Sequence, residues 1–393
     1  MTAAAFSLSE IQQSEHDHSL PLYAKREIAL VRGEGAYLYD SDGKRYLDAM
    51  SNYGVAVLGH ADPEFTAALA DQLATLSTCH QSFYNDQRAA LLEVIAKISP
   101  AELQRSFLSN SGAEAIEAAL KFARATTGRT DVVAAKRGYH GRTLGALSAT
   151  ADVKYRKPFE PLPIPATHVS FGDLDALDAA VDENTSAIIL EPIQGEAGIY
   201  PATIEYLAGA REIATRKGAL LIADEIQSGF RTGAPFVSVA LGVIPDIIAT
   251  AKAVANGFPI GLTLTTDAIS EAMPGGAHGT TFGGNPLACR AAVVTLNALE
   301  SRGLYARAET LGAQIIERIE GIGSPKVRQV RGKGFMIGLE MKERVTPTLR
   351  GLQEAGVLAL TASSTSLRFL PPMIWEQQQV DELIAVLEVV LAQ

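Results

Sequence analysis

Short apolar runs alternate with amphipathic helical patterns in the middle of the chain, between about residues 63 and 261. The runs predict buried strands at 132–135, 187–190, 219–223 and 246–250. Helical patterns lie between them, as at 111–125 and 203–217. This alternation is typical of a mostly parallel sheet covered by helices, so we expect an α/β fold.

The pattern changes on either side of this region. A polar arm over residues 1–20 precedes two short strands within 30–48, joined by a turn at 41–43. After residue 300 the pattern predicts a helix (303–320), strands near 326–341, a short strand around 367–370 and an amphipathic helix (376–391). We therefore expect three segments: residues 1–48, which contribute to a small domain, a large domain over 49–300, and a smaller α+β domain over 301–393.

A first candidate for chemistry is the start of the helix predicted near Ser111. Ser111 and Glu114 have the spacing of a capping box, and Gly112 and Ala113 leave the backbone N–H groups of the first turn uncovered. Such a helix start attracts a phosphate group through its free donors and the helix dipole. An ordinary capped helix explains the same pattern.

Two charged side chains follow neighbouring predicted strands. Asp224 ends the run 219–223, and Lys252 follows the run 246–250. Because the carboxyl ends of parallel strands meet at one edge of a sheet, both side chains can face one crevice. There a carboxylate can pair with a protonated ring nitrogen, Gln227 can donate to a nearby oxygen, and a desolvated lysine can form a Schiff base. Taken singly, a helix cap or salt bridge explains Asp224, and solvent exposure explains Lys252.

The three signals together suit one ligand. A phosphate site, a carboxylate for a pyridinium nitrogen and a Schiff-base lysine are what pyridoxal 5′-phosphate (PLP) requires. We therefore expect a PLP enzyme.

Composition and charge exclude several other classes. The chain is 47% hydrophobic and 20% charged, as in a soluble globular protein, and its net charge of −10 argues against a nucleic-acid-binding protein. No apolar run reaches the ~18 residues of a membrane span, and residues 1–20 contain no Lys or Arg of a targeting signal. Cys79 and Cys289 lie far apart, and the histidines have no metal-ligand spacing. We expect a cytoplasmic protein with no metal, no nucleic acid and no membrane partner.

A series of longer motifs makes the expectation more specific. They are SNSGAEAIEAALKFAR (109–124), YHGRT (139–143), EPIQGEAG (191–198), LLIADEIQSGF (220–230), HGTTFGGNP (278–286), VRGKGFMIGLE (330–340) and LRFLPP (367–372). With these motifs in this order, the chain resembles the class III aminotransferases of PLP fold type I, the acetylornithine and ornithine aminotransferase family, from about Tyr23 to Pro372. The resemblance implies a PLP-binding large domain over 49–300.

The resemblance assigns cofactor-binding roles to matching positions. Lys252 would be the lysine that bonds to PLP, Asp224 would hold the pyridine nitrogen protonated, and Gln227 would hydrogen-bond the ring oxygen. Tyr139 would stack on the ring. The phosphate would be bound by Ser111, Gly112 and Ala113, with Thr281 reaching in from the partner subunit of a homodimer.

Substrate contacts follow from the same resemblance. Arg368 would bind the α-carboxylate of glutamate or 2-oxoglutarate, Arg142 would hold the other carboxylate, and Glu196 would act as a switch on Arg368. Tyr23 and Tyr53 match positions that also bear tyrosines in ornithine aminotransferases, where they would contact the distal end of the substrate. Packing explains these two tyrosines equally well.

Two loops depart from the family pattern. The stretch 229–233 reads GFRTG, one glycine shorter than the usual GFGRTG. After Lys252, Ala255 and Asn256 interrupt a run that is usually rich in glycine. We expect the local loop geometry to differ at both places.

The stretch 154–162 looks like enzymes that act on lysine or ornithine attached to the LysW carrier protein. We therefore predict transfer of the terminal amine of N-acetylornithine, or of lysine on an amino-group carrier protein, to 2-oxoglutarate, in arginine or lysine biosynthesis. Two alternatives stay open: an aminotransferase for free ornithine, and an aminomutase of the glutamate-semialdehyde type. The pairing of Arg368 with Glu196 argues against an aminomutase, because such a pair serves two alternating substrates.

Overall fold

We describe the protein from a computed structural model, which covers residues 6–392. Within this range no helix is both long enough and apolar enough to span a bilayer. The cytoplasmic location stays a prediction.

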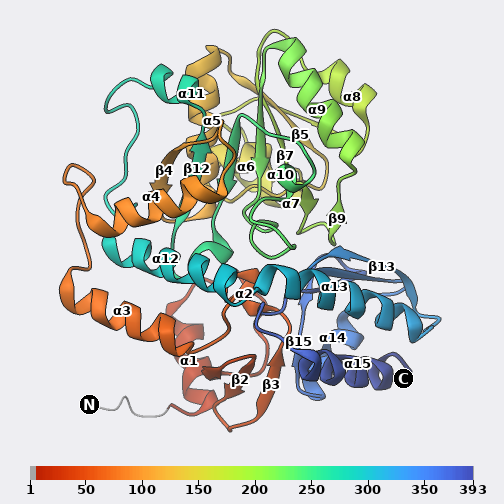
Figure 1. The fold of residues 1–393 in the computed structure, drawn as a ribbon. Helices are drawn as coiled ribbons and strands as arrows, with labels where there is room; N and C mark the ends of the chain where they lie inside the picture. Colours follow the sequence, from red (N-terminus) through yellow and green to blue (C-terminus); the bar gives the residue numbers. More distant parts are fainter. Residues whose placement is uncertain (1–5, 393) are drawn as a thin grey trace.

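A seven-stranded sheet forms the centre of the upper part of the molecule (Figure 1). Its strand order is β4-β12-β11-β10-β7-β5-β6, and β12 runs antiparallel to both of its neighbours. The remaining pairs are parallel, as the sequence predicts. The strands are β4 (Arg105–Ser109), β5 (Asp131–Ala135), β6 (Ala166–Val169), β7 (Thr185–Leu190), β10 (Leu220–Asp224), β11 (Ile247–Thr250) and β12 (Gly261–Thr265).

Helices cover both faces of this sheet, which explains why its strands are apolar throughout. Every residue of β7 is buried, as expected for a strand with no solvent-facing side. One face packs its apolar side chains against α5 (Gly112–Thr127), and the other against α8 (Leu174–Ala180) and α9 (Ile204–Lys217). The remaining helices of this region are α3 (Pro63–Thr75), α4 (Asp86–Ile98), α6 (Leu144–Ala149), α7 (Val153–Arg156), α10 (Val237–Ala240) and α11 (Asp267–Ala272).

Two smaller sheets form the lower part of the molecule. One has the order β1-β2-β3-β15 and the other β13-β14-β17-β16. In the first sheet Leu47 of β3 lies opposite Val357 of β15, so the two ends of the chain share a sheet. This pairing agrees with the expectation that residues 1–48 contribute to the small domain, but the domain limits at 48 and 300 stay predictions. The strands are β1 (Leu30–Glu34), β2 (Tyr37–Asp40), β3 (Arg45–Asp48), β13 (Val327–Lys333), β14 (Met336–Met341), β15 (Val357–Leu358), β16 (Leu360–Thr361) and β17 (Ser366–Phe369).

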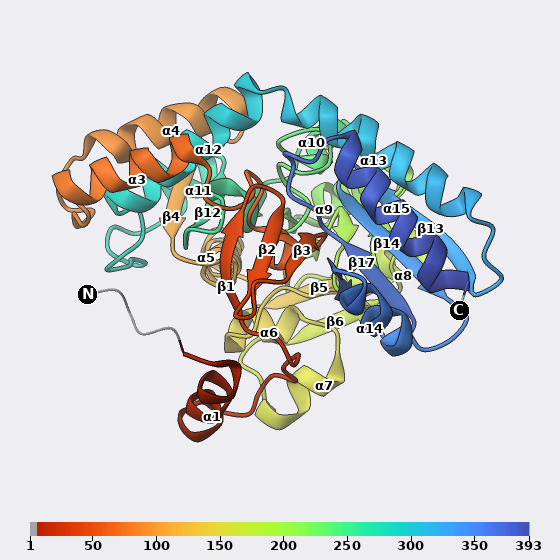
Figure 2. The same ribbon diagram turned by 90° about the horizontal axis from the view of Figure 1, so that it is seen from below.

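Two long consecutive helices link the upper and lower parts. α12 (Pro286–Ser301) and α13 (Leu304–Gly321) cross the middle of the molecule in Figure 1. One continuous apolar core joins residues of α12, α13, the large sheet and both smaller sheets. Figure 2 shows β1 to β3 lying between α3 and α4 on one side and the C-terminal strands with α15 (Gln377–Ala392) on the other. Helix α14 (Thr346–Glu354) packs against α15.

The N-terminal region differs from the expectation in two respects. Residues 8–18 form a helix, α1 (Leu8–His18), where a polar arm was predicted; Ser7 and Glu10 form a capping box that satisfies its first N–H groups. Residues 30–48 contain three strands instead of two, because the chain reverses at Gly35 as well as at Gly43. The predicted arm also includes residues 1–5, which lie outside the described range.

Candidate active site

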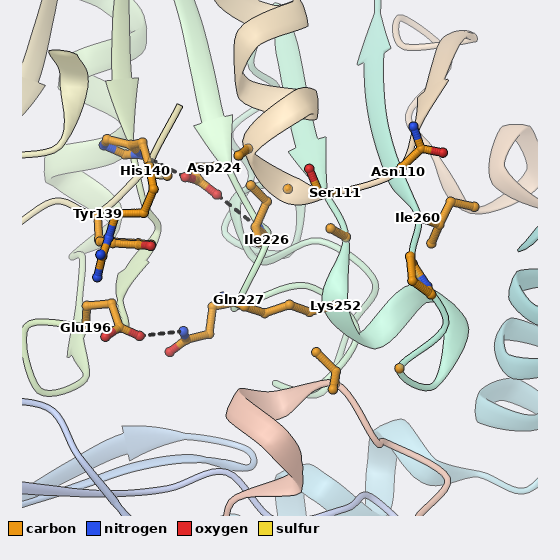
Figure 3. A pocket seen from close by; sticks show the side chains of 18 of the residues that line it. Asn110, Ser111, Tyr139, His140, Glu196, Asp224, Ile226, Gln227, Lys252 and Ile260 are labelled. Atoms are coloured by element: carbon orange, nitrogen blue, oxygen red, sulfur yellow. Dashed lines mark hydrogen bonds and ion pairs between the residues drawn. The ribbon is translucent and has the colours of Figure 1, made fainter. Parts of the chain in front are cut away.

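A cavity of about 350 Å³ lies at the carboxyl ends of the large sheet. The segments that follow β4, β5, β7, β10 and β11 all contribute to its lining, together with the loop that leads into β12. The five strands that precede these segments run parallel to one another, so the polar residues at their ends converge on one crevice. Figure 3 shows the labelled side chains around it. No cluster of three or more metal-binding side chains occurs among residues 6–392.

The start of α5 forms one side of the cavity. Ser111 is its N-cap and accepts a hydrogen bond from the Glu114 N–H at 3.2 Å. The predicted capping box is only half formed, because Glu114 Oε2 accepts from the Asn110 N–H at 2.5 Å instead of from Ser111. Ser111, Gly112 and Ala113 all line the cavity, as the prediction requires.

Asp224, the last residue of β10, is buried and lines the cavity. Its Oδ1 accepts the Ile226 N–H at 3.1 Å, and its Oδ2 lies 2.7 Å from Nδ1 of His140. Burial opposes the charged form of His140, but the hydrogen bond and negative charge of Asp224 outweigh it, and the pKa of His140 is raised. His140 lies within the YHGRT motif, but its sequence position alone indicates no role.

Glu191 is a second buried carboxylate that the sequence analysis missed. It directly follows β7, and its two oxygens accept the N–H groups of Tyr139 at 2.9 Å and of Gly195 at 3.0 Å. Burial raises the pKa of Glu191 to about 7, partly opposed by His140. Glu191 thus fixes two loops that line the cavity, and its motif position, at the head of EPIQGEAG, was the available signal.

Lys252 begins the short 3₁₀ helix η2 (Lys252–Ala255), separated from the end of β11 by Ala251 alone. Its backbone adopts a φ of 41°, in the left-handed region that non-glycine residues rarely occupy. Burial lowers the pKa of its amine, although the negative charges of Glu196 and Asp224 act in the opposite direction. In Figure 3 its side chain points toward Gln227, so the amine and the carboxylate end of β10 face the same crevice, as predicted.

Arg368, Glu196 and Gln227 form a polar cluster beside the cavity. Arg368 Nη1 lies 2.7 Å from Glu196 Oε1 and donates to Gln227 Oε1 at 3.0 Å. The Arg368 side chain is fully buried, whereas Glu196 is partly exposed. Burial alone would raise the pKa of the Glu196 carboxyl, but the charge of Arg368 outweighs burial and lowers it. The predicted pairing of Glu196 with Arg368 is therefore formed, while the switching role stays a prediction.

Tyr53 lies in an unusual turn next to this cluster. Four consecutive residues, 51–54, have positive φ angles between 38° and 86°. This left-handed turn holds the Tyr53 ring with its centroid 5.4 Å from the Arg368 guanidinium carbon. The position agrees with a substrate contact, which stays a prediction.

Arg142 and Tyr139 also line the cavity. The Arg142 guanidinium carbon lies 5.5 Å from the centroid of the Tyr139 ring and 3.8 Å from that of Tyr155. Tyr155 also packs edge-on against Tyr139 at 6.1 Å. Tyr155 belongs to the stretch 154–162, whose sequence alone predicts no contact for this side chain.

Two predicted site residues lie away from the cavity. Tyr23 is 81% exposed and lines a separate hollow between α1 and β1, so the geometry of one chain gives its predicted substrate contact no support. Thr281 is exposed and does not line the cavity either. The prediction assigned Thr281 to the partner's site, which one chain leaves untested.

The two loops that depart from the family pattern are stabilised by different contacts. In the shortened 229–233 loop, Phe230 adopts a φ of 65° and is buried against Phe236. Asn256 adopts a φ of 48°, which asparagine tolerates better than most residues. Its side chain accepts from the Leu58 N–H at 2.8 Å and donates to the Gly59 carbonyl at 3.3 Å. Asn256 therefore ties the lysine loop to residues 58–59, which a glycine could not do.

Comparisons of the whole chain with protein families, with curated proteins and with solved structures all match aminotransferases. The aminotransferase class-III model matches residues 22–391. The chain is 44% identical over 395 residues to LysW-aminoadipate semialdehyde transaminase of Deinococcus radiodurans, covering 100% of this chain and 92% of the relative. It is 40% identical over 394 residues to acetylornithine aminotransferase of Mycobacterium tuberculosis, covering 100% and 98%. A structure of Toxoplasma gondii ornithine aminotransferase, which has partial occupancy of PLP at its active site, matches with a TM-score of 0.93 and 29% identity over 98% of this chain and 94% of that one. The expected fold type I architecture is thereby confirmed, and the chain belongs to the class-III aminotransferase family and is an aminotransferase.

Proposed function

We propose that the chain binds PLP in the cavity at the strand ends and uses it to transfer a terminal amino group to 2-oxoglutarate. The donor set suits that cofactor: a buried carboxylate at Asp224, an amine at Lys252 and a helix start at 111–113. The helix start also needs a glycine at position 112, because a Cβ there would lie 2.9 Å from the side chain of Ile226, which lines the same cavity.

Each group would hold one part of the cofactor. The helix start would bind the phosphate, and Thr281 of the partner subunit would complete that site. Asp224, oriented by His140, would stabilise a proton on the ring nitrogen. Tyr139 would stack on the ring, and Gln227 would donate to its oxygen.

PLP, when bound, supplies an aldehyde that condenses with amines and a ring that accepts the electrons released when the carbon–hydrogen bond beside the amine breaks. The Lys252 amine suits the transfer of that proton, because burial favours its neutral, basic form. Glu191 supports the arrangement by fixing the loop that carries Tyr139.

The amino donor we propose is N-acetylornithine, or lysine held by an amino-group carrier protein such as LysW. The products would be a semialdehyde and glutamate. The names of relatives at 40% and 44% identity support this choice. The observation that carries the assignment to a terminal-amine donor is the 2.7 Å pair of Arg368 and Glu196 beside the Lys252 cavity. A terminal amine brings no carboxylate to Arg368, so Glu196 would neutralise it in that half-reaction and release it to the α-carboxylate of 2-oxoglutarate.

We also propose a homodimer. Exposed aromatic side chains lie near Thr281, and two loops that carry them are tied together by the hydrogen bond from Gln81 Nε2 to the Gly283 carbonyl at 2.9 Å. These aromatic side chains are Phe83, Tyr84 and Phe282. An exposed apolar patch of this kind marks an interaction surface, and closed two-fold pairing is the commonest solution.

A substrate panel tests the proposal. N-acetylornithine, carrier-bound lysine, free ornithine and γ-aminobutyrate are each incubated with 2-oxoglutarate, and glutamate formation is measured. We expect the highest kcat/KM with an acylated or carrier-bound substrate. Lys252→Ala should abolish both turnover and borohydride trapping of PLP, whereas Lys217→Ala, at the end of α9 and outside the cavity lining, should retain both. Preference for free ornithine, or trapping at another lysine, would contradict the proposal.

A further inference from the structure

The loop that carries Lys252 has three residues in the left-handed region of φ. Lys252, Asn256 and Gly257 have φ angles of 41°, 48° and 94°. Glycine adopts such an angle without strain and asparagine with little, but a lysine rarely adopts it. A strained residue keeps its conformation only where the surrounding contacts fix it. The position of the Lys252 amine therefore depends on what holds residues 252–257 in place.

Core packing holds one side of this loop. Ala253, Val254 and Ala255 are buried, and the short helix η2 packs against α12. The Val254 N–H donates to the Ala251 carbonyl at 3.0 Å. The Phe258 N–H donates to the Ala255 carbonyl at 2.9 Å, so both backbone bonds stay within the loop. These contacts shape the loop, but they provide no directional bond to another segment.

The Asn256 side chain provides the bonds to another segment. Its Oδ1 accepts the Leu58 N–H at 2.8 Å, and its Nδ2 donates to the Gly59 carbonyl at 3.3 Å. Among residues 6–392, no other hydrogen bond links 252–258 to a distant part of the chain. The Asn256 amide is therefore the directional restraint on the loop.

The segment that receives these bonds is itself firmly held. The Val57 carbonyl accepts the Met373 N–H at 2.7 Å. His60 exchanges two backbone hydrogen bonds with Gly35, at 2.9 and 2.8 Å. The ring Nε2 of His60 lies 2.7 Å from Oδ2 of the buried Asp48. Asn256 thus links the lysine loop to a segment that is bonded to the β1–β2 turn and to the residues after β17.

We propose that Asn256 is a positioning residue for Lys252, and that its bonds to residues 58 and 59 hold the strained turn so that the amine stays directed into the cavity. This inference rests on the proposed function, in which Lys252 transfers a proton. Asn256 itself lies outside the cavity lining, so it acts on the proton-transfer step through Lys252 and not on substrate binding.

Asn256→Gly tests the inference, because glycine keeps the left-handed backbone and removes both bonds. Single turnovers of the holoenzyme are measured with glutamate and, separately, with the preferred amino donor. We expect the rate constant to fall about tenfold in each half-reaction, the scale of a small displacement of a reacting group. The substrate concentration at half-maximal rate should stay within about twofold of the wild-type value. Ala61→Gly is the matched control, since Ala61 is exposed, has a φ of 54° and should keep both rates.

Labelling of Lys252 in the cofactor-free protein gives a readout that does not depend on turnover. Acetic anhydride is applied over a range of pH, and modification of Lys252 is measured by mass spectrometry. Burial lowers the pKa of this amine in the folded chain, so an amine released toward solvent should be modified at higher pH. We expect the profile to shift to higher pH in Asn256→Gly and to stay unchanged in Ala61→Gly.

An unchanged labelling profile in Asn256→Gly would overturn the inference, because slower turnover would then have a purely structural cause. Wild-type rates in both half-reactions would overturn it as well. Failure of the proposed function would look different: the wild-type holoenzyme would form no glutamate, while the labelling of Lys252 would still report on Asn256.

Discussion

At the scale of single residues, Arg368 is a buried charge that needs a partner of opposite charge. Its side chain is fully buried, and a buried guanidinium without a carboxylate is costly. Glu196 and Gln227 provide oxygens at 2.7 and 3.0 Å. Glu196 reaches Arg368 from the EPIQGEAG segment and is partly exposed, so it is the partner that can leave.

We therefore predict an asymmetric effect of Glu196→Ala. The freed Arg368 should bind α-carboxylates more tightly, so the half-reaction with glutamate should keep or gain rate. The half-reaction with the terminal-amine donor should slow by roughly a hundredfold, because breaking a buried pair costs about 3 kcal/mol when nothing replaces it. Single-turnover rates of each half-reaction measure this directly. Glu196→Gln, which keeps an oxygen and loses the charge, should fall between. Equal slowing of both half-reactions would make Glu196 a structural residue only.

At the scale of elements, the left-handed turn over 51–54 depends on contacts from distant segments. Asp48 Oδ1 accepts the N–H groups of Met50 and Ser51, at 3.0 and 2.8 Å. Ser51 Oγ donates to the Leu370 carbonyl at 2.6 Å. Arg231, fully buried, lies against the end of the turn, and burial lowers the pKa of its guanidinium to about 9. Four left-handed residues in succession are unfavourable by themselves, so these contacts determine where Tyr53 lies.

Gly54→Ala tests that dependence. Gly54 has a φ of 86°, and a Cβ there would lie 3.2 Å from the Arg231 guanidinium carbon. Gly172 has a φ of 89° with no atom within 4 Å of its Cβ position, so Gly172→Ala isolates the cost of the backbone angle alone. We expect Gly172→Ala to lower the free energy of unfolding by about 1 kcal/mol and Gly54→Ala by roughly 2–3 kcal/mol. Urea unfolding measures both. Equal losses would show that contact with Arg231 does not restrain the turn.

At the scale of the whole molecule, two buried groups at the sheet edge couple stability to pH. The pKa of Glu191 is raised to about 7 by burial, and the pKa of His140 is raised by Asp224 against burial. In both cases the folded state binds protons that the unfolded state has already released. Their contribution to stability is therefore complete at low pH and is lost as pH rises, from about 4.5 through 7 for Glu191 and above 6.5 for His140.

We predict that thermal unfolding of the cofactor-free protein shifts to lower temperature between about pH 5 and pH 8. Glu191→Gln cannot titrate, so its unfolding temperature should decline less steeply with pH than that of the wild type. At acid pH it should unfold at a lower temperature than the wild type, because its one amide oxygen can accept from Tyr139 or from Gly195 but not from both. Glu183→Gln, an exposed carboxyl in a loop, should keep the wild-type slope. If the Glu191→Gln slope matches that of the wild type, Glu191 does not titrate in this window.

The sequence by itself determined the parts of this protein that depend on local pattern. Apolar runs gave the strands of the parallel sheet, because burial on both faces requires continuous apolar side chains. The ends of those strands gave Asp224 and Lys252 as candidates, because the carboxyl ends of parallel strands meet at one edge of a sheet. The ordered motifs gave the family, which the full-length relatives confirm.

Only the tertiary structure decided which side chains meet. His140 and Asp224 are 84 residues apart, and no periodicity records their hydrogen bond. The same holds for Tyr155 beside Arg142, and for β3 paired with β15 from the other end of the chain. Tyr23 matches a family position by sequence, yet in this chain it lines the separate hollow between α1 and β1. The physical reason is that burial and helix starts are properties of short segments, whereas a buried polar group finds its partner only when loops from several strands close around it.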